Sequence, residues 1–297
     1  MTVHLQGLGV VGSLLAHRLK AERIPFTWHD TDEQFTAWQA CTGSVYPTAD
    51  EYEYENYCRW HVLLLDDLHN LSRYVEQGQW CYNSVAPPHG GAVRGVRAQQ
   101  IIAPVTISDA TTIQFDMQSL VRDTRNRFAS REVLAPRKRD LVIVTHGSAQ
   151  AETFVWGWSA LVRLAFSDEM AAACAELSKR PVFYLRQVYD MSYLYPKPGR
   201  DDLWYGGTAT ISQRTPKQLD VQAHYKRWKA KVRERSGGHV EVAGGLRGSL
   251  SEGWRPKAAT ELPLVAWKDE QTLLCRPMGG NGVRFFPTLS DAILEEL

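Results

Sequence analysis

The sequence lacks the features that mark secreted, membrane-spanning or metal-stapled proteins. Its five cysteines are spread along the chain without a CxxC pair, which argues against a disulfide framework or a zinc site. The N-terminus does not have the basic-then-apolar order of a signal peptide. No apolar run approaches the length of a bilayer span, since "HVLLLDDL" breaks after four residues. We therefore expect a soluble protein of the reducing cytoplasm, with no membrane partner.

The sequence also lacks a strong excess of either charge. A formal net charge of +1 predicts no global field, so composition alone does not indicate a nucleic-acid partner. There is no internal repeat, low-complexity tract or obvious linker. With 297 residues, of which 44% are apolar, the chain can form one large domain or two interlocked ones around a substantial core.

Strand and helix patterns alternate along the chain. A short strand at 3–6 leads through a glycine turn to a helix at about 12–22, and a second strand ends at Asp30. This alternation predicts an α/β protein. The other expected elements are a helix within 56–78, strands within 81–117, a helix at 117–129, a buried strand at 141–145, a largely helical stretch at 152–176, strands at 181–189 and 203–212, a helix at 215–237, strands with glycine turns after 238, and a closing helix from Pro287.

The first turn carries the GxGxxG spacing of dinucleotide-binding proteins. Gly7 permits the tight turn, Gly9 lets the backbone approach a pyrophosphate, and Gly12 allows the helix to pack closely on the strand. The pyrophosphate would then meet the N–H groups and the positive dipole end of the helix. The predicted dinucleotide site comprises Gly7, Gly9, Val10, Val11, Gly12 and Asp30.

The second strand ends in an acid, which suits hydrogen bonds from ribose hydroxyls. Asp30 lies at the strand end, whereas the alternative acid Asp32 lies beyond it. An acid rather than a basic residue at this place argues against a ribose carrying a 2′-phosphate. The local pattern does not distinguish a nicotinamide cofactor from a flavin.

The other end of the chain bears on that choice. The stretches "DLVIVTHGSA", "GGLRGSLSEGWRPKAATELPLVAW" and "RPMGGNGVRFFPTLSDAILEEL", in this order after the glycine turn, resemble the FAD-dependent D-amino acid oxidase and glycine oxidase family. The resemblance spans nearly the whole chain and implies that the last glycine turn returns to the flavin. It implies FAD as the cofactor, with further contacts from Gly147, Gly279, Gly280, Asn281 and Gly282.

A loop near the start is also similar to that family. "ACTGSVYPT" stands where the family has a Ser/Gly-rich loop beside the flavin ring, which implies that Thr42, Gly43 and Ser44 contact the cofactor. Its "GSVYP" resembles the "GALYP" loop of the tRNA-modifying oxidase that removes a carboxymethyl group from the aminomethyl side chain of a wobble uridine. The resemblance therefore extends the range of substrates to glycine-like side chains on a nucleobase.

The family chemistry is oxidation of a C–N bond next to a carboxylate, by hydride transfer to the flavin and hydrolysis of the resulting imine. The carboxylate of the amine substrate needs a fixed cation, and the planar fork of arginine suits it. Arg247, in "GLRG", matches the family residue that contacts this carboxylate, and Tyr46 is a candidate pocket wall or hydroxyl donor. A structural ion pair for Arg247 and a core position for Tyr46 are the alternatives.

The sequence also departs from the family pattern. Glycine oxidases carry a second arginine before the "NG" of the last turn, where this chain has Gly280, so that contact is missing or comes from Arg284 or Arg255. The departure makes free glycine a doubtful substrate. Further candidates with equally plain structural explanations are the pocket tyrosines Tyr195 and Tyr205, His146 near the cofactor, and Cys275 for a covalent flavin link.

The helix expected at 215–237 is rich in basic residues. Val221, Tyr225, Trp228 and Val232 form an apolar stripe, and the basic residues of 224–235 cover the other faces. A solvated helix packed on the domain is one interpretation. The other is a surface that contacts the phosphates of a nucleic acid, aided by "PRKR" at 136–139.

The predicted architecture is a Rossmann-like FAD-binding α/β domain of the D-amino acid oxidase type with an inserted strand-rich substrate domain. The FAD-binding parts are 1–80, 121–176 and 244–297, and the substrate-domain parts are 81–120 and 177–243. The predicted function is FAD-dependent oxidation of a glycine-type or secondary amine that carries a carboxylate. The alternatives are the same chemistry on a modified nucleobase in tRNA or DNA, a nicotinamide-dependent dehydrogenase, and a non-catalytic flavoprotein.

Overall fold

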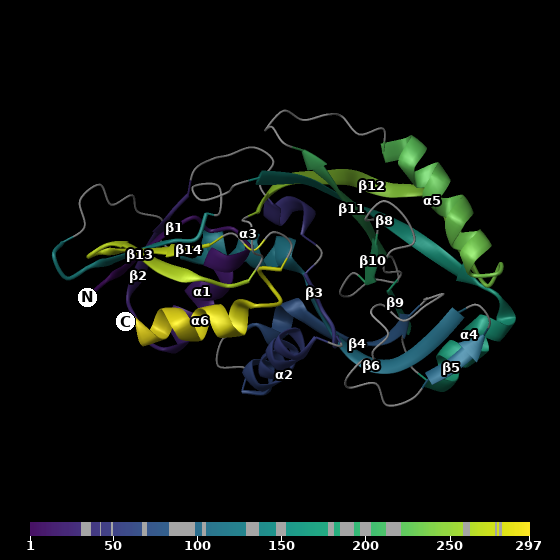
Figure 1. Ribbon diagram of the computed structural model, residues 1–297, viewed down its shortest axis with the longest axis horizontal. Coiled ribbons are helices and arrows are strands. Elements are labelled where there is room, and N and C mark those ends of the chain that lie inside the picture. Colours follow the sequence, from purple (N-terminus) through teal and green to yellow (C-terminus); the bar gives the residue numbers. More distant parts are fainter. Residues whose placement is uncertain are drawn as a thin grey trace.

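The structure is a computed structural model of the chain and describes most of its residues (Figure 1). The residues that it does not describe are 31–36, 42, 49, 67–69, 83–98, 103–104, 129–136, 147–152, 178–180, 185–192, 197–202, 212–220, 258–261, 277 and 279–280. The described strands form three sheets, one of them mainly parallel and two mainly antiparallel.

The mainly parallel sheet holds the first strand of the chain at its interior. β1 pairs in parallel with both β2 and β7, β14 continues in parallel beside β7, and β13 closes the edge as an antiparallel strand. All four residues of β7, "LVIV", are buried, as expected for a strand covered on both faces. The bounds are β1 Val3–Gln6, β2 Phe26–His29, β7 Leu141–Val144, β13 Val265–Asp269 and β14 Thr272–Cys275.

Four helices surround this sheet and share its core. α1 contacts both α3 and α6, and α2 packs against α6 (Figure 1). α2 begins where Asp50 caps the helix by accepting a hydrogen bond from the backbone N–H of Glu53, at 2.9 Å. Their bounds are α1 Val10–Ala21, α2 Glu51–Leu65, α3 Met117–Arg127 and α6 Phe286–Glu295. None of the helices in the described part of the chain combines the length and apolar character that crossing a membrane requires.

The two other sheets form the rest of the molecule. One has the order β10-β11-β8-β12, and α5 (Val221–Arg235) lies along β12 (Figure 1). The other has the order β3-β6-β4-β9, with β5 beside β6, and α4 (Asp168–Leu177) contacts β5, β6 and β8. The strand bounds are β3 Ser44–Val45, β4 Val75–Tyr82, β5 Gln99–Ile102, β6 Val105–Phe115, β8 Thr153–Phe166, β9 Pro181–Tyr184, β10 Tyr193–Pro196, β11 Leu203–Ile211 and β12 Val240–Lys257; the 3₁₀ turns are η1 Ala37–Ala40 and η2 Ser72–Tyr74.

The α/β class and the parallel sheet expected from the sequence are confirmed, but two elements were predicted wrongly. The helix expected at 56–78 spans Glu51–Leu65, and β4 already begins at Val75. Residues 152–176 were expected to be largely helical, whereas Thr153–Phe166 form β8 and only the segment from Asp168 is helical. β8 is the strand between β11 and β12, so pairing on both edges outweighs the local helical pattern of its sequence. The division into FAD-binding and substrate-domain parts stays a prediction.

Candidate functional site

The first glycine turn is packed so closely that two of its glycines leave no room for a side chain. Gly7 has φ +99°, and a Cβ built there would lie 2.7 Å from the Cβ of His146. A Cβ on Gly12 would overlap the carbonyl oxygen of Gly7 and lie 2.7 Å from Oγ1 of Thr145. The β1–α1 connection therefore packs closely against Thr145 and His146, the two residues that follow β7.

Gly9 differs from its neighbours because a Cβ built there meets nothing within 4 Å. It is the N-cap of α1, and its cap has no side-chain hydrogen bond. The backbone N–H groups and the positive dipole end of α1 thus face an open space. This space fits the pyrophosphate of a dinucleotide, because the missing side chain lets an anionic group approach the backbone.

Asp30 lies directly beside this turn. Its Oδ2 accepts a hydrogen bond from the backbone N–H of Leu8 at 3.1 Å, and the same oxygen pairs with Nη2 of Arg125. Nε of Arg125 donates to the carbonyl oxygen of Leu8 at 3.2 Å. The alternative acid, Asp32, lies outside the described residues.

Arg125 is the residue here that the sequence reasoning missed. From the sequence it was a residue of the expected helix at 117–129, with no predicted contact to Asp30. Arg125 and Asp30 are 95 residues apart in sequence, so no local pattern reveals their pairing. The acid predicted for the ribose therefore has a guanidinium partner from a distant helix.

The last turn of the chain returns to the start of α1. A Cβ built on Gly282 would lie 3.2 Å from Cγ2 of Val11 and 4.0 Å from Cγ1 of Val10. The turn begins with a hydrogen bond from the N–H of Asn281 to the carbonyl of Met278 at 2.9 Å. The backbone at 282 therefore lies against the first helical turn of α1. Gly147, Gly279, Gly280 and Thr42, also predicted at the cofactor, lie outside the described residues.

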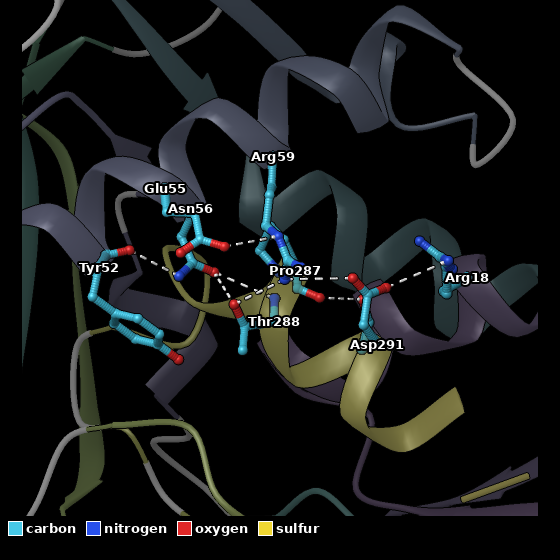
Figure 2. Close-up of polar contacts among 9 residues, drawn as sticks. Arg18, Tyr52, Glu55, Asn56, Arg59, Pro287, Thr288 and Asp291 are labelled. Carbon is cyan, nitrogen blue, oxygen red and sulfur yellow. Dashed lines mark hydrogen bonds and ion pairs between the residues drawn. The ribbon is translucent and has the colours of Figure 1, made fainter. Parts of the chain in front are cut away.

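Polar contacts from α2 hold the last turn and α6 in place. Nε1 of Trp60 donates to the carbonyl of Val283 at 2.8 Å. Oδ1 of Asn56 accepts hydrogen bonds from the N–H and the hydroxyl of Thr288, at 3.3 and 2.8 Å (Figure 2). Asp291 pairs with Arg59 of α2 and with Arg18 of α1, each at 3.5 Å (Figure 2). Segments from the beginning and the end of the chain thus form one unit.

The loop after η1 enters the third sheet near this unit. Gly43 is buried and its carbonyl accepts a hydrogen bond from the N–H of Phe115 at 3.0 Å, while the hydroxyl of Ser44 donates to Oε1 of Gln114. Cys41, just before it, is half-buried. Burial raises the pKa of its thiol, and the nearby charge of Arg255 opposes this effect. Arg255 therefore lies close to the same loop.

Tyr46 and Arg284 form a buried pair at the junction of this loop with the last turn. The guanidinium carbon of Arg284 lies 4.4 Å from the centre of the Tyr46 ring, which is a cation–π arrangement. Nη1 of Arg284 also pairs with Oε1 of Glu53 at 2.8 Å. Arg284 thus interacts with protein groups on two sides, and its buried positive charge is paired with the carboxylate of Glu53.

Arg247 lies in an irregular part of β12. It stands opposite Leu161 of β8, between two register shifts that separate it from the pairs Ala243–Arg163 and Ser251–Ser159. Bulges of this kind are frequent next to active sites. The carbonyl of Gly244, within the first shift, accepts a hydrogen bond from the hydroxyl of Tyr225 on α5 at 3.0 Å.

The remaining candidates lie on three other strands, β10, β11 and β14. Tyr205, on β11, stands opposite Ala160 of β8, and Tyr195 lies on the neighbouring strand β10. Cys275 ends β14 and is buried, and burial raises the pKa of its thiol to about 12. A thiol that stays protonated at neutral pH does not suit a covalent link to a flavin, because the thiolate is the reactive form.

Solved structures share this fold over almost the whole chain. Iminodiacetate oxidase from Chelativorans sp. BNC1 matches with a TM-score of 0.65 and 15% identity, covering 99% of this chain and 95% of that one. Glycine oxidase from Bacillus cereus matches with a TM-score of 0.63 and 15% identity, covering 100% and 95%. An FAD-dependent oxidoreductase from Pseudomonas aeruginosa matches with 0.57 and 14%, covering 100% and 91%. No protein-family model and no curated protein matches the sequence. The chain therefore has the fold of these oxidoreductases.

Proposed function

We propose that the protein is an FAD-dependent oxidoreductase that oxidises the C–N bond of a glycine-type or secondary amine. The observation that carries this proposal is the close approach of Gly282 to Val11, where an added Cβ would lie 3.2 Å from Cγ2 of Val11, so that the last turn lies against the start of α1. A space bordered by both ends of the chain suits an extended cofactor. The fold supports the proposal, because it matches end to end two structures of oxidases named for small carboxylate-bearing amines.

The residues of the first turn fit the dinucleotide part of FAD. The open space at Gly9 admits the pyrophosphate, and Asp30 offers carboxylate oxygen to the ribose. Asn281 and Gly282 on one side, and Gly43 and Ser44 on the other, would then border the flavin. When bound, the flavin supplies the acceptor for the hydride that leaves the carbon next to the amine.

The roles left to the protein are binding and orientation of the amine. Arg247 would hold the substrate carboxylate, because its guanidinium offers the two parallel donors that a carboxylate accepts. Tyr46 would form a fixed wall, since its ring is held by the guanidinium of Arg284. The product imine then reacts with water, which releases an amine and a carbonyl compound.

A second candidate substrate is the same amine attached to a nucleobase. The observation behind it is α5, where Tyr225 and Val232 are buried, Lys226 and Arg227 are exposed, and the hydroxyl of Tyr225 donates to the carbonyl of Gly244. A polymer substrate would make binding fall steeply with salt, because phosphate contacts release counterions. Binding of a tRNA to the purified protein between 50 and 200 mM salt, about the range over which such contacts weaken strongly, would test this. An affinity independent of salt would remove the nucleic-acid alternative.

The visible spectrum of the purified protein tests the main proposal. We expect a flavin spectrum, release of FAD on heating, and bleaching of the spectrum by a carboxylate-bearing secondary amine under anaerobic conditions. Admission of air then distinguishes an oxidase, which forms hydrogen peroxide, from a dehydrogenase that needs another acceptor. A colourless protein that binds NAD and cannot be reconstituted with FAD would contradict the proposal. The cytoplasmic location stays a prediction.

A further inference from the structure

We infer that Arg125 is a positioning residue for the adenosine end of the cofactor, and that the cluster of Arg125, Asp30 and Trp38 makes the site selective for a dinucleotide over a mononucleotide. The inference rests on the proposed FAD function, and it concerns residues of α3 and η1, which the GxGxxG pattern does not include. Three independent contacts support it.

The first contact orients the acid. Arg125 pairs with Oδ2 of Asp30, and the N–H of Leu8 donates to the same oxygen. Among the described residues, no group donates to Oδ1 of Asp30. Arg125 therefore fixes the carboxylate in one rotation, with one oxygen committed to the protein and the other left to accept from a ribose hydroxyl.

The second contact fixes the turn itself. Nε of Arg125 donates to the carbonyl of Leu8, between Gly7 and Gly9. One guanidinium thus links α3 to the backbone that would approach the pyrophosphate and to the acid that would bind the ribose. Because the donors of arginine are held in a rigid planar fork, both distances are set together.

The third contact adds an indole to the cluster. The guanidinium carbon of Arg125 lies 5.4 Å from the centre of the Trp38 ring. Nε1 of Trp38 is buried and has no hydrogen-bond partner in the described part of the chain. A buried donor without a partner is costly, and an acceptor on the bound adenosine part would satisfy it.

The test compares flavins with and without the adenosine part. The apoprotein of the wild type and of R125Q, R125K and R122Q would be titrated with FAD and with FMN, using the change in flavin fluorescence. ADP would serve as a competitor of FAD. Arg122 is an exposed residue of the same helix, so R122Q is the matched control.

We expect R125Q to weaken FAD binding by about tenfold or more, as for loss of a charge-assisted hydrogen-bond network, and to leave FMN binding unchanged. R125K keeps the charge but not the fork, so it should weaken FAD by an intermediate factor. The affinity for ADP, measured by competition, should fall in parallel with the affinity for FAD. If FMN binds to none of the proteins, this ADP measurement replaces the comparison with FMN. R122Q should match the wild type.

A second variant separates binding from stability. W38F keeps an aromatic ring beside Arg125 and removes the buried donor, so it should weaken FAD several-fold without lowering the thermal midpoint of the apoprotein. Equal losses for FAD and FMN in R125Q, or no loss for either, would overturn the inference while leaving the FAD function standing. Wild-type protein that binds no FAD would overturn both.

Discussion

Two glycine-containing segments of this molecule differ in how closely they are packed. At Gly7 and Gly12 an added Cβ would collide with Thr145 or His146, whereas at Gly244 and Gly245 of β12 it meets nothing within 4 Å. The first turn is determined by packing between β1, α1 and the end of β7. The second is open, and its described polar contacts are the hydrogen bonds that its carbonyl accepts from α5.

The difference shows how the two halves of the proposed site keep their geometry. In the nucleotide half, close packing allows only one conformation of the backbone, so the geometry of this half depends on the packing of the protein core. The substrate half depends on a strand that departs from regular pairing and on a helix that holds it. We therefore expect changes in the first half to affect folding and cofactor affinity, and changes in the second to affect substrate binding.

Gly12→Ala should give the largest effect. Its Cβ would overlap the Gly7 carbonyl, and neither backbone segment can move without opening the β1–α1 connection, so we expect a loss of about 3 kcal/mol or more in the free energy of unfolding. Denaturant unfolding and flavin content measure it. Gly245→Ala is the control and should be nearly neutral, since nothing lies near its added methyl group. Similar losses in both variants would contradict the comparison.

Arg247→Gln should come next, and its effect should fall on the substrate. Loss of a charge-assisted contact to a carboxylate predicts a KM for a carboxylate-bearing amine that rises about 30-fold or more, with flavin content and the thermal midpoint unchanged. Arg163→Gln, at an exposed position of β8, is the control. An unchanged KM in R247Q would assign Arg247 a structural role instead.

Tyr225→Phe tests whether α5 holds the bulge. It removes the hydroxyl that donates to Gly244 and should cost about 1 kcal/mol of stability. If the bulge orients Arg247, KM should also rise several-fold while kcat is unchanged. Steady-state kinetics and thermal unfolding measure the two effects, with Lys226→Gln, at an exposed position of the same helix, as the reference. A loss of stability without any change in KM would separate the bulge from substrate binding.

The smallest expected effect belongs to His61 on α2, in the packed half. Burial lowers the pKa of His61 below its ordinary value of 6.5. The unfolded chain therefore binds the proton more readily, so stability falls as the pH drops below about 6.5. Comparing the thermal midpoint at pH 7.5 and 5.5, we expect His61→Gln to show a smaller fall than the wild type. An equal fall would assign the acid sensitivity to other groups.

The sequence predicted the parts of the fold that depend on local signals. The strand, glycine turn and helix at 3–22 are found as expected, because each is determined by residues close together in the chain. β8 was missed because its strand state comes from pairing with β11 and β12 on both sides. Arg125 and the Glu53–Arg284 pair were missed for the same kind of reason, since ion pairs between distant segments leave no periodic pattern.

The contacts between α2 and the last turn also bear on the order of folding. Trp60 and Val283 are 223 residues apart, and Asn56 and Thr288 are 232 apart. Contacts so distant in sequence close large loops and slow the folding of a chain. During synthesis the glycine turn leaves the ribosome early, but the segment that borders the other side of the same space follows only near residue 282. The proposed cofactor space therefore cannot close on an N-terminal fragment, so that capture of a dinucleotide there would be a late step in biogenesis.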